Sequence, residues 1–391
     1  MFIVKSVFSI LFILLFCQPG HSQLHQDVPR LLADMNVQIE ATQAVNDLYN
    51  FKFERAERQF RWLKQKYKWH PLPYFLLGLS EWWKIVPNME VTTYDAKFLA
   101  YMDSSIYMAG KLYELDNSNI EAAFFLSAAY GFKGRLYSDR KSWGKATSAG
   151  KNALKYLDKS KGQDDLSPEF QFGDALYNYY SVWVPENYPL LKPILMFFSR
   201  GDKNLGIKQL KEVANNAFYT RTEAQNFLMR ILAVEENDPL SALPVSEYLA
   251  ATFPDNAYFQ RFYARLLYSA GRQRQTEQVS LDILKKIEKG MVGYEATSGR
   301  YAAFYLGQIY ESNRDYENSK KYYKMAIEYG EEIEAYESGY YLYSLLALAK
   351  IADREKDKAA SRNYLNQIKQ HAKRKHPAHK AARDYMKSRK N

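Results

Sequence analysis

The chain has 391 residues and a formal net charge of +10, with 47% hydrophobic and 25% charged residues, which are the proportions of an ordinary folded protein. Glycine (18) and proline (13) are scarce, whereas aromatic residues reach 16%. Folds rich in strands need more turns than these residues supply, so the composition argues against all-β and α/β folds and favours helices. The single cysteine, Cys17, excludes a disulfide within one chain.

The N-terminal segment, residues 1–22, predicts a signal peptide. A short positively charged start precedes an apolar run that ends at Cys17 and is too short to span a membrane, which takes about 20 residues. Small residues then predict cleavage near Ser22–Gln23. No lipid anchor at Cys17 is expected, because the bulky Phe16 precedes it. We therefore expect an exported protein of the periplasm, cell envelope or exterior, without a transmembrane segment in the mature chain.

Helical periodicity begins near Ala41 and recurs through Gln370, in about six or seven units. The early units are partial, and their marks are Ala56, Phe60 and Leu63, then Leu77-Gly78 after Pro71, then Leu126-Ser127 with Tyr130.

Two stretches interrupt this period. Residues Gly131–Trp143 are expected to lengthen a link between two helices. Within it, Arg135, Asp139 and Arg140 predict an internal salt-bridge network, and ligand contact is the alternative. The second stretch, Phe172–Gly206, contains several prolines and the apolar run Ile194–Phe198, which we expect to be a buried plug. Contact with a membrane or a partner is the other interpretation of this run.

The clearest helical hairpin is predicted over Tyr301–Tyr329. Its marks are Leu306-Gly307, Tyr310, Ser319, Tyr323 and Ala326, with a turn at Asn313-Arg314-Asp315. Small residues on both helices allow close approach, and bulky residues fill the surrounding space. This spacing is similar to that of the tetratricopeptide repeat (TPR). Because one hairpin cannot bury its apolar face alone, its neighbours must stack against it.

The same offsets recur in the units on either side. They are occupied by Leu348-Ala349, Ala352, Ser361, Leu365 and Ile368 downstream, and by Ala242, Leu249, Pro254, Tyr263-Ala264 and Leu267 upstream. The sequence therefore predicts an all-α fold, an α-solenoid of stacked TPR-like helical hairpins wound as a right-handed superhelix.

A more specific resemblance covers roughly Glu121–Ala270. The residues that carry it are Tyr177-Asn178-Tyr179-Tyr180, the prolines that follow, Gly201-Asp202-Lys203, Gly206-Ile207-Lys208-Gln209-Leu210, Glu223-Ala224 and Phe253-Pro254-Asp255-Asn256. In this order the chain resembles the tetratricopeptide repeat protein 39 (inclusion-body-clearance) family and its exported bacterial relatives. The resemblance implies a TPR-type adaptor and supplies no catalytic residues. The signal peptide departs from the eukaryotic members, so their cellular role does not transfer.

Three regions are thus predicted: a signal peptide at 1–22, a TPR-like solenoid at 23–370 and a basic C-terminal tail at 371–391. The tail holds most of the net charge, with Asp384 as its only acid. We expect a solvated, disordered tail, with peripheral attachment to an anionic envelope surface as the alternative. No nucleic-acid partner is expected, because no recognition module accompanies the tail.

No constellation of catalytic or metal-ligating residues is present in the sequence. His371, His376 and His379 lie among lysines and arginines, which would repel a cation. The segment Gly144–Lys151 resembles a phosphate-binding loop, but its glycines are one residue too far apart and Asn152 replaces the Ser or Thr of that motif. We therefore expect no enzyme, no cofactor and no metal.

The TPR pattern implies that the first helix of each hairpin lines a concave groove. The residues at groove positions are Tyr258, Arg261, Arg265, Tyr268, Tyr301, Phe304, Gln308, Tyr343 and Lys350. Aromatic rings interleaved with arginine suit an extended peptide or an anionic ligand, because rings offer rigid contact area and arginine offers forked hydrogen bonds. The other interpretation is that curvature buries several of these residues against neighbouring helices.

The function favoured by the sequence is a non-catalytic scaffold or adaptor of the cell envelope that binds a protein or peptide in this groove. One alternative is a module that binds saccharide or a small anionic ligand through the aromatic residues around Trp82, Trp83 and Tyr301. A less favoured alternative is an enzyme with a site in the irregular region 131–206.

Overall fold

The structure is a computed structural model that describes residues 30–160, 162, 167–189 and 199–388. Contacts divide the chain into two units, Met1–Leu31 and Leu32–Asn391, and every feature described below belongs to the second. The predicted signal peptide with Cys17, the cleavage site near Ser22–Gln23 and the apolar run Ile194–Phe198 lie outside the described residues.

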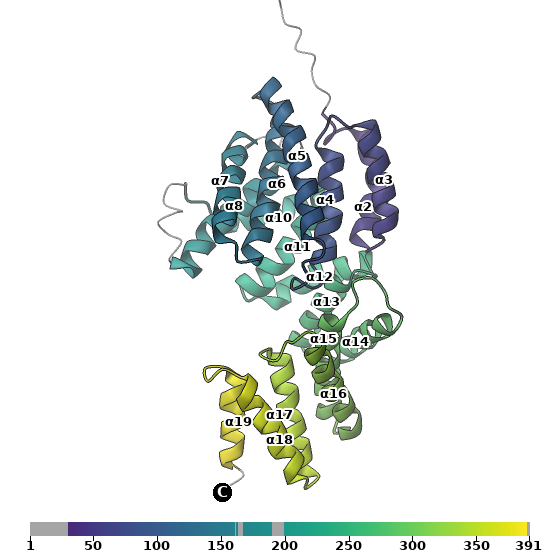
Figure 1. Ribbon diagram of the computed structural model, residues 1–391, viewed down its shortest axis with the longest axis vertical. Helices are drawn as coiled ribbons and strands as arrows, with labels where there is room; N and C mark the ends of the chain where they lie inside the picture. The colour runs from purple at the N-terminus through teal and green to yellow at the C-terminus, as the bar shows by residue number, and fades with distance from the viewer. Residues whose placement is uncertain (1–29, 161, 163–166, 190–198, 389–391) are drawn as a thin grey trace, which may run out of the picture. The chain divides into compact units, whose positions relative to one another are not determined.

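The described part of the second unit is an all-α solenoid, as predicted, in which successive helices pack in chain order (Figure 1). Its first helix pairs are α2 (Met35–Tyr49) with α3 (Phe53–Lys66), α4 (Leu72–Ile85) with α5 (Asp95–Leu115), α6 (Ile120–Asp139) with α7 (Trp143–Ser160), and α8 (Pro168–Asn187) with α10 (Lys203–Asn216).

The later pairs follow the same order. They are α11 (Arg221–Arg230), extended by the π-helical turn η2 (Ile231–Glu235), with α12 (Pro239–Thr252), α13 (Ala257–Ser269) with α14 (Gln273–Glu288), α15 (Ala296–Ser312) with α16 (Tyr316–Glu332), and α17 (Gly339–Arg354) with α18 (Lys358–His371). The last described helix is α19 (Pro377–Ser388).

Short polar side chains begin many of these helices. An oxygen of the residue before the helix accepts a backbone N–H of the first turn, which would otherwise lack a partner. The residues in this role include Asp34, Asn119, Asp202, Asp238, Asn256, Asp315, Ser338 and Asp357.

Small residues hold the two helices of a hairpin close together. A Cβ atom added to Gly307 of α15 would lie 2.7 Å from the ring of Tyr323 of α16. Ser319, also on α16, is fully buried and donates its hydroxyl to the carbonyl oxygen of Gly307 at 3.0 Å. The predicted role of these small residues in the 301–329 hairpin is therefore confirmed.

The predicted long link over Gly131–Trp143 is wrong. Helix α6 continues to Asp139 and α7 begins at Trp143, so only three residues separate them. Arg140 in this short link binds the carboxylate of Asp95 through Nε at 2.6 Å and Nη2 at 2.9 Å, and Nη2 also donates to the carbonyl of Val91 at 2.9 Å. Arg140 therefore fixes a neighbouring loop through Asp95, which lies outside the stretch. The predicted network among Arg135, Asp139 and Arg140 does not form, because Arg135 has no ion-pair or hydrogen-bond partner among the described residues at its buried Nη1 atom.

The solenoid also continues beyond residue 370. Helix α19 packs on α17 and α18, and its Ala378 and Ala382 are fully buried in the C-terminal core. The expectation of a disordered tail is therefore wrong for Pro377–Ser388. The periodicity was hidden by the charge: small apolar residues recur on one face, while the opposite face is basic.

Early helices pack against the middle of the chain. Glu223 of α11 is buried and accepts hydrogen bonds from Trp83 Nε1 at 2.7 Å and from the Tyr49 hydroxyl at 3.3 Å. The ring of Trp83 also lies edge-on to Phe259 of α13, with 5.1 Å between centroids. These contacts place α2 and α4 against α11 and α13.

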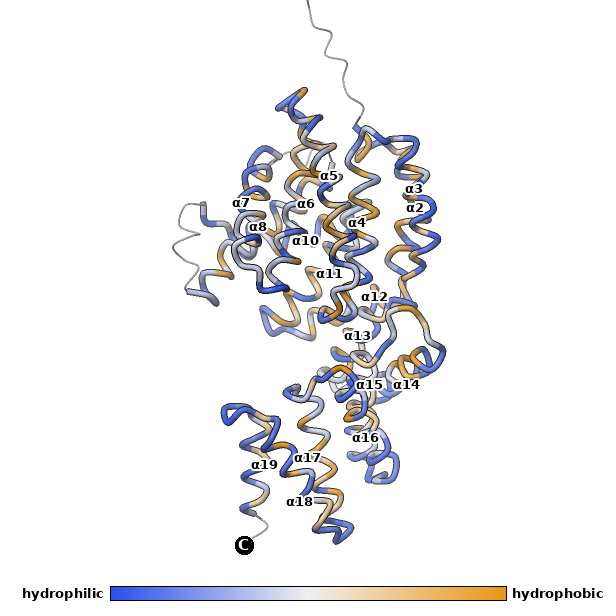
Figure 2. Tube along the Cα trace, viewed as in Figure 1, coloured by the Kyte–Doolittle hydropathy of each residue, from blue (hydrophilic) through white to orange (hydrophobic). Residues whose placement is uncertain are grey.

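Hydrophobic and hydrophilic residues alternate along the helices, and hydrophilic residues occupy most of the turns (Figure 2). No described helix combines the length and the apolar character that a membrane span requires.

Candidate functional site

The predicted groove residues lie on three helices. Those of the first repeat are on α13, those of the second are on α15, and Tyr343 and Lys350 are on α17. Helix α15 contacts both α13 and α17, so the first helices of successive hairpins are neighbours. That arrangement is the one the groove prediction requires.

Two of the candidates are used by the chain itself. Arg261 Nη1 donates to the carbonyl of Pro87 and to the hydroxyl of Ser298, both at 3.0 Å. The ring of Tyr258 lies 6.0 Å from that of Trp83. Tyr258 and Arg261 therefore join α13 to the early helices, which is the burial that the sequence left open as the other interpretation.

A second group forms a continuous surface, which we call the aromatic face: Tyr268, Tyr301, Phe304, Gln308 and Tyr340. The ring centroids of Tyr301 and Tyr340 are 4.2 Å apart, and those of Phe304 and Tyr340 are 5.1 Å apart. Tyr268 stacks at 4.7 Å on the buried Tyr305, whose hydroxyl lies 3.1 Å from that of Tyr340. Contacts among the rings therefore hold them in place without a ligand.

Two arginines border the aromatic face without an acidic partner. Arg265 is half-buried, and its guanidinium forms no ion pair or hydrogen bond within the described part of the chain and lies 5.7 Å from the ring centroid of Phe262. Arg300 is 8% exposed, and its Nε and Nη1 atoms are buried without a hydrogen-bond acceptor. Burial, together with the nearby Arg261, lowers the pKa of Arg300. A buried cation in this state favours an incoming anion.

Tyr340 and Arg300 are functional candidates that the sequence did not single out. Neither residue falls on a predicted groove position: Arg300 directly precedes Tyr301, and Tyr340 lies three residues before Tyr343. A double tyrosine, Tyr340-Tyr341, was the available signal. By contrast, Lys350 lies 5.8 Å from the ring centroid of Tyr385 on α19, and Tyr343 packs against the C-terminal core.

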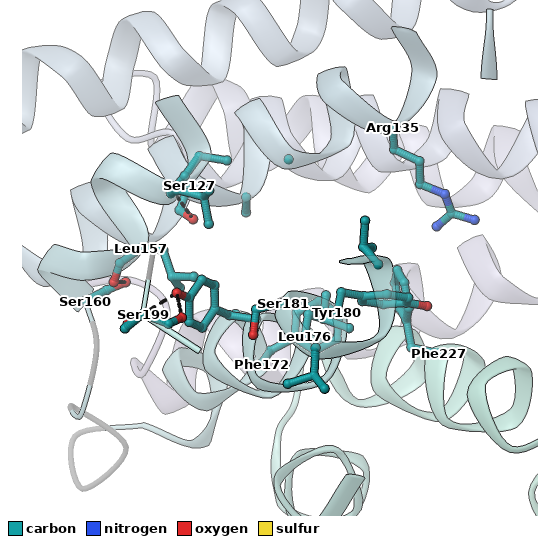
Figure 3. A pocket seen from close by; sticks show the side chains of 18 of the residues that line it. Ser127, Arg135, Leu157, Ser160, Phe172, Leu176, Tyr180, Ser181, Ser199 and Phe227 are labelled. Carbon is teal, nitrogen blue, oxygen red and sulfur yellow. Dashed lines mark hydrogen bonds between the residues drawn. The ribbon is translucent and has the colours of Figure 1, made fainter. Parts of the chain in front are cut away.

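A separate cavity of about 740 Å³ lies between α6, α7 and α8, with Phe227 of α11 at one side (Figure 3). It exists because the facing positions carry small side chains, including Ser127, Ala128 and Gly131 on α6. A Cβ atom added to Gly131 would meet nothing within 4 Å. Most of the residues that line the cavity lie in or next to the region 131–206, which the sequence analysis describes as irregular.

The polar groups of the cavity are mostly occupied. Ser127 donates its hydroxyl to the carbonyl of Ala153 at 3.0 Å, and Ser160 donates to that of Leu157 at 3.2 Å. The Tyr180 hydroxyl donates to Glu235 Oε1 at 3.3 Å, and burial, with this carboxylate, raises the pKa of Tyr180. Ser127 and Ser160 thus contact carbonyl groups, whereas an activated nucleophile would contact a base.

Trp82 and Trp83 are fully buried, so they offer no surface to a saccharide. Within the described ranges, no group of three His, Cys, Asp or Glu side chains gathers as a metal site would require.

The fold and the two sites define a helical-repeat protein with a preformed aromatic surface and a mainly apolar cavity. No protein-family model matches the chain, and a search of curated proteins finds no match either.

Proposed function

We propose that this chain is a non-catalytic binding protein of the TPR class, which holds an extended, acidic peptide or protein segment on the aromatic face. The observation that carries the proposal is the pair Arg265 and Arg300, which border fixed aromatic rings without an acidic partner. Rings provide contact area at low entropic cost, and a carboxylate between arginines gains charge-assisted hydrogen bonds. The resemblance over Glu121–Ala270 also favours an adaptor.

The signal-like segment at residues 1–22 supports export to the periplasm, the cell envelope or the exterior. In that case the mature protein starts at Gln23, and mass spectrometry of the protein purified from its host tests this. A chain that retains Met1 would contradict export by cleavage.

Selection of displayed random peptides tests the binding site. Peptides selected on the full chain should be acidic and contain aromatic residues. Their affinity should fall about tenfold or more in Arg265→Glu, because an attractive contact becomes repulsive. Arg274→Glu is the matched control, since Arg274 is an exposed arginine of α14 away from the aromatic face. Equal affinity for both variants would contradict the site, and selection of peptides without acids would contradict the ligand class.

A further inference from the structure

The cavity between α6, α7 and α8 extends along helix α6. Its lining positions on α6 run from Phe124 to Arg135 on one face of the helix, a distance of about 16 Å at 1.5 Å per residue. The volume of about 740 Å³ lies inside the usual range of small-molecule sites, about 300–1,000 Å³.

Most of the lining is apolar. Leu154 and Leu157 of α7 and Phe172 and Leu176 of α8 face the cavity. The hydroxyls of Ser127 and Ser160 donate to backbone carbonyls, and Ser181 Oγ accepts the backbone N–H of Gly201 at 3.0 Å. A surface of this kind favours an aliphatic chain, whose burial removes apolar area from water. It offers little to a sugar or a nucleotide, which need several free donors and acceptors.

Three charged residues of the described chain interrupt this apolar lining. Glu186 and Arg200 pair with each other at 3.6 Å, whereas Arg135, at one end of the cavity, forms no ion pair with any described residue. Figure 3 shows Arg135 and Phe227 at the side opposite Ser199. The guanidinium carbon lies 4.7 Å from the ring centroid of Trp82 and 5.3 Å from that of Phe227. Its Nη1 atom is buried, and no acceptor among the described residues reaches it.

The surroundings of Arg135 lack a compensating ion pair. Glu223 and Asp139 act on it electrostatically, but neither lies within 4.0 Å of its guanidinium. Arg230 lies nearby as a second cation, and burial together with Arg230 lowers the pKa of Arg135. A carboxylate at this end would pair with a cation that the fold leaves unpaired, in a region where charges interact strongly.

We infer that the cavity binds a free long-chain fatty acid, with the aliphatic chain between α6 and α8 and the carboxylate beside Arg135. This inference is independent of the peptide site, because it rests on other helices and another class of ligand.

Calorimetric titration of the delipidated full chain tests it, with octanoate, laurate and lauryl alcohol as probes. Laurate should bind at one saturable site. Octanoate should bind more weakly, by about fourfold for each methylene removed. Lauryl alcohol should bind at least about tenfold more weakly than laurate, because it lacks the charge that pairs with Arg135.

Gly131→Leu assigns the binding to the cavity. Its side chain enters open space, and leucine forms helix better than glycine, so the fold is kept. Laurate affinity should fall about tenfold or more. Gly110→Leu on α5 is the matched control, because a Cβ atom there also meets nothing within 4 Å but Gly110 does not line the cavity.

Arg135→Met tests the head group. Methionine keeps the apolar stem and removes a buried charge, so the variant should fold, and circular dichroism verifies this. It should bind laurate and lauryl alcohol equally. Absence of saturable laurate binding, equal binding by Gly131→Leu and the parent chain, or a carboxylate preference that survives Arg135→Met would each overturn the inference.

Discussion

Glu223 lies where two distant parts of the chain meet, and its two carboxylate oxygens have different surroundings. Oε1 accepts the hydrogen bonds of Trp83 and Tyr49, whereas Oε2 is buried without a donor. Burial raises the pKa of Glu223. The folded state therefore holds the proton more tightly than the unfolded state does. The resulting stability is fully present below the unfolded pKa of about 4.3 and is lost as pH rises through the folded pKa.

Replacement of Glu223 by glutamine should therefore stabilise the fold at pH 7, by about 1–2 kcal/mol, because the acceptor remains and the charge is removed. The gain should shrink as pH falls towards about 4. Chemical denaturation at several pH values measures both effects. Glu328→Gln, at an exposed position of α16, is the control and should change little. A loss of stability at pH 7 in Glu223→Gln would show that attraction to Arg135 outweighs the cost of burial.

At the scale of a single hairpin, the contact of Gly307 with Tyr323 sets how closely α15 and α16 approach. Valine at 307 would force the ring of Tyr323 or the helix axis to move, because the added Cβ lies 2.7 Å from the ring. We expect a loss of about 1–3 kcal/mol in the free energy of unfolding, as for other overpacked cores. Gly110→Val, in open space on α5, should be nearly neutral. Equal stability of the two variants in urea titrations would contradict the steric argument.

The hairpins were predictable from the sequence because their contacts are local. Gly307, Ser319 and Tyr323 lie within one hairpin, so fixed offsets determine which side chains meet. The same logic identified Tyr301, Phe304 and Gln308 as neighbours on one helix face.

Contacts between distant helices could not be predicted in this way. The spacing of residues within a repeat does not predict that Trp83 contacts Phe259, or that Arg261 donates to the carbonyl of Pro87. The cavity was missed for a related reason. Gly131 and Gly134 suggested a link between helices in the sequence, but both lie within α6. The missing side chain at Gly131 leaves open space beside the helix and does not mark a turn.

At the scale of the whole second unit, stability should vary along the chain, because each hairpin contacts chiefly its neighbours. Ending the chain at Lys375 removes α19 and uncovers the apolar surface that Ala378 and Ala382 bury. The free energy of opening measured by hydrogen exchange should then fall by about 2 kcal/mol in α17 and α18, so that their amides exchange faster. Exchange in α4 and α6 should stay unchanged.

The control for this truncation is a chain that ends at Ser388, which retains α19. It should exchange like the full chain. If α17 and α18 keep their protection without α19, the helix adds charge but does not cap the array.

The hydrogen bonds of Glu223 also set an order of events during synthesis. Tyr49 and Trp83 leave the ribosome long before Glu223 exists, and the emerging N-terminal helices must wait with large apolar rings uncovered. Exposed rings of this kind make an unfinished chain prone to aggregate, which is a reason for chaperones to bind it. A chain that cannot finish burying its beginning until more than half of it has been translated depends on such protection for longer than an array built only from adjacent contacts.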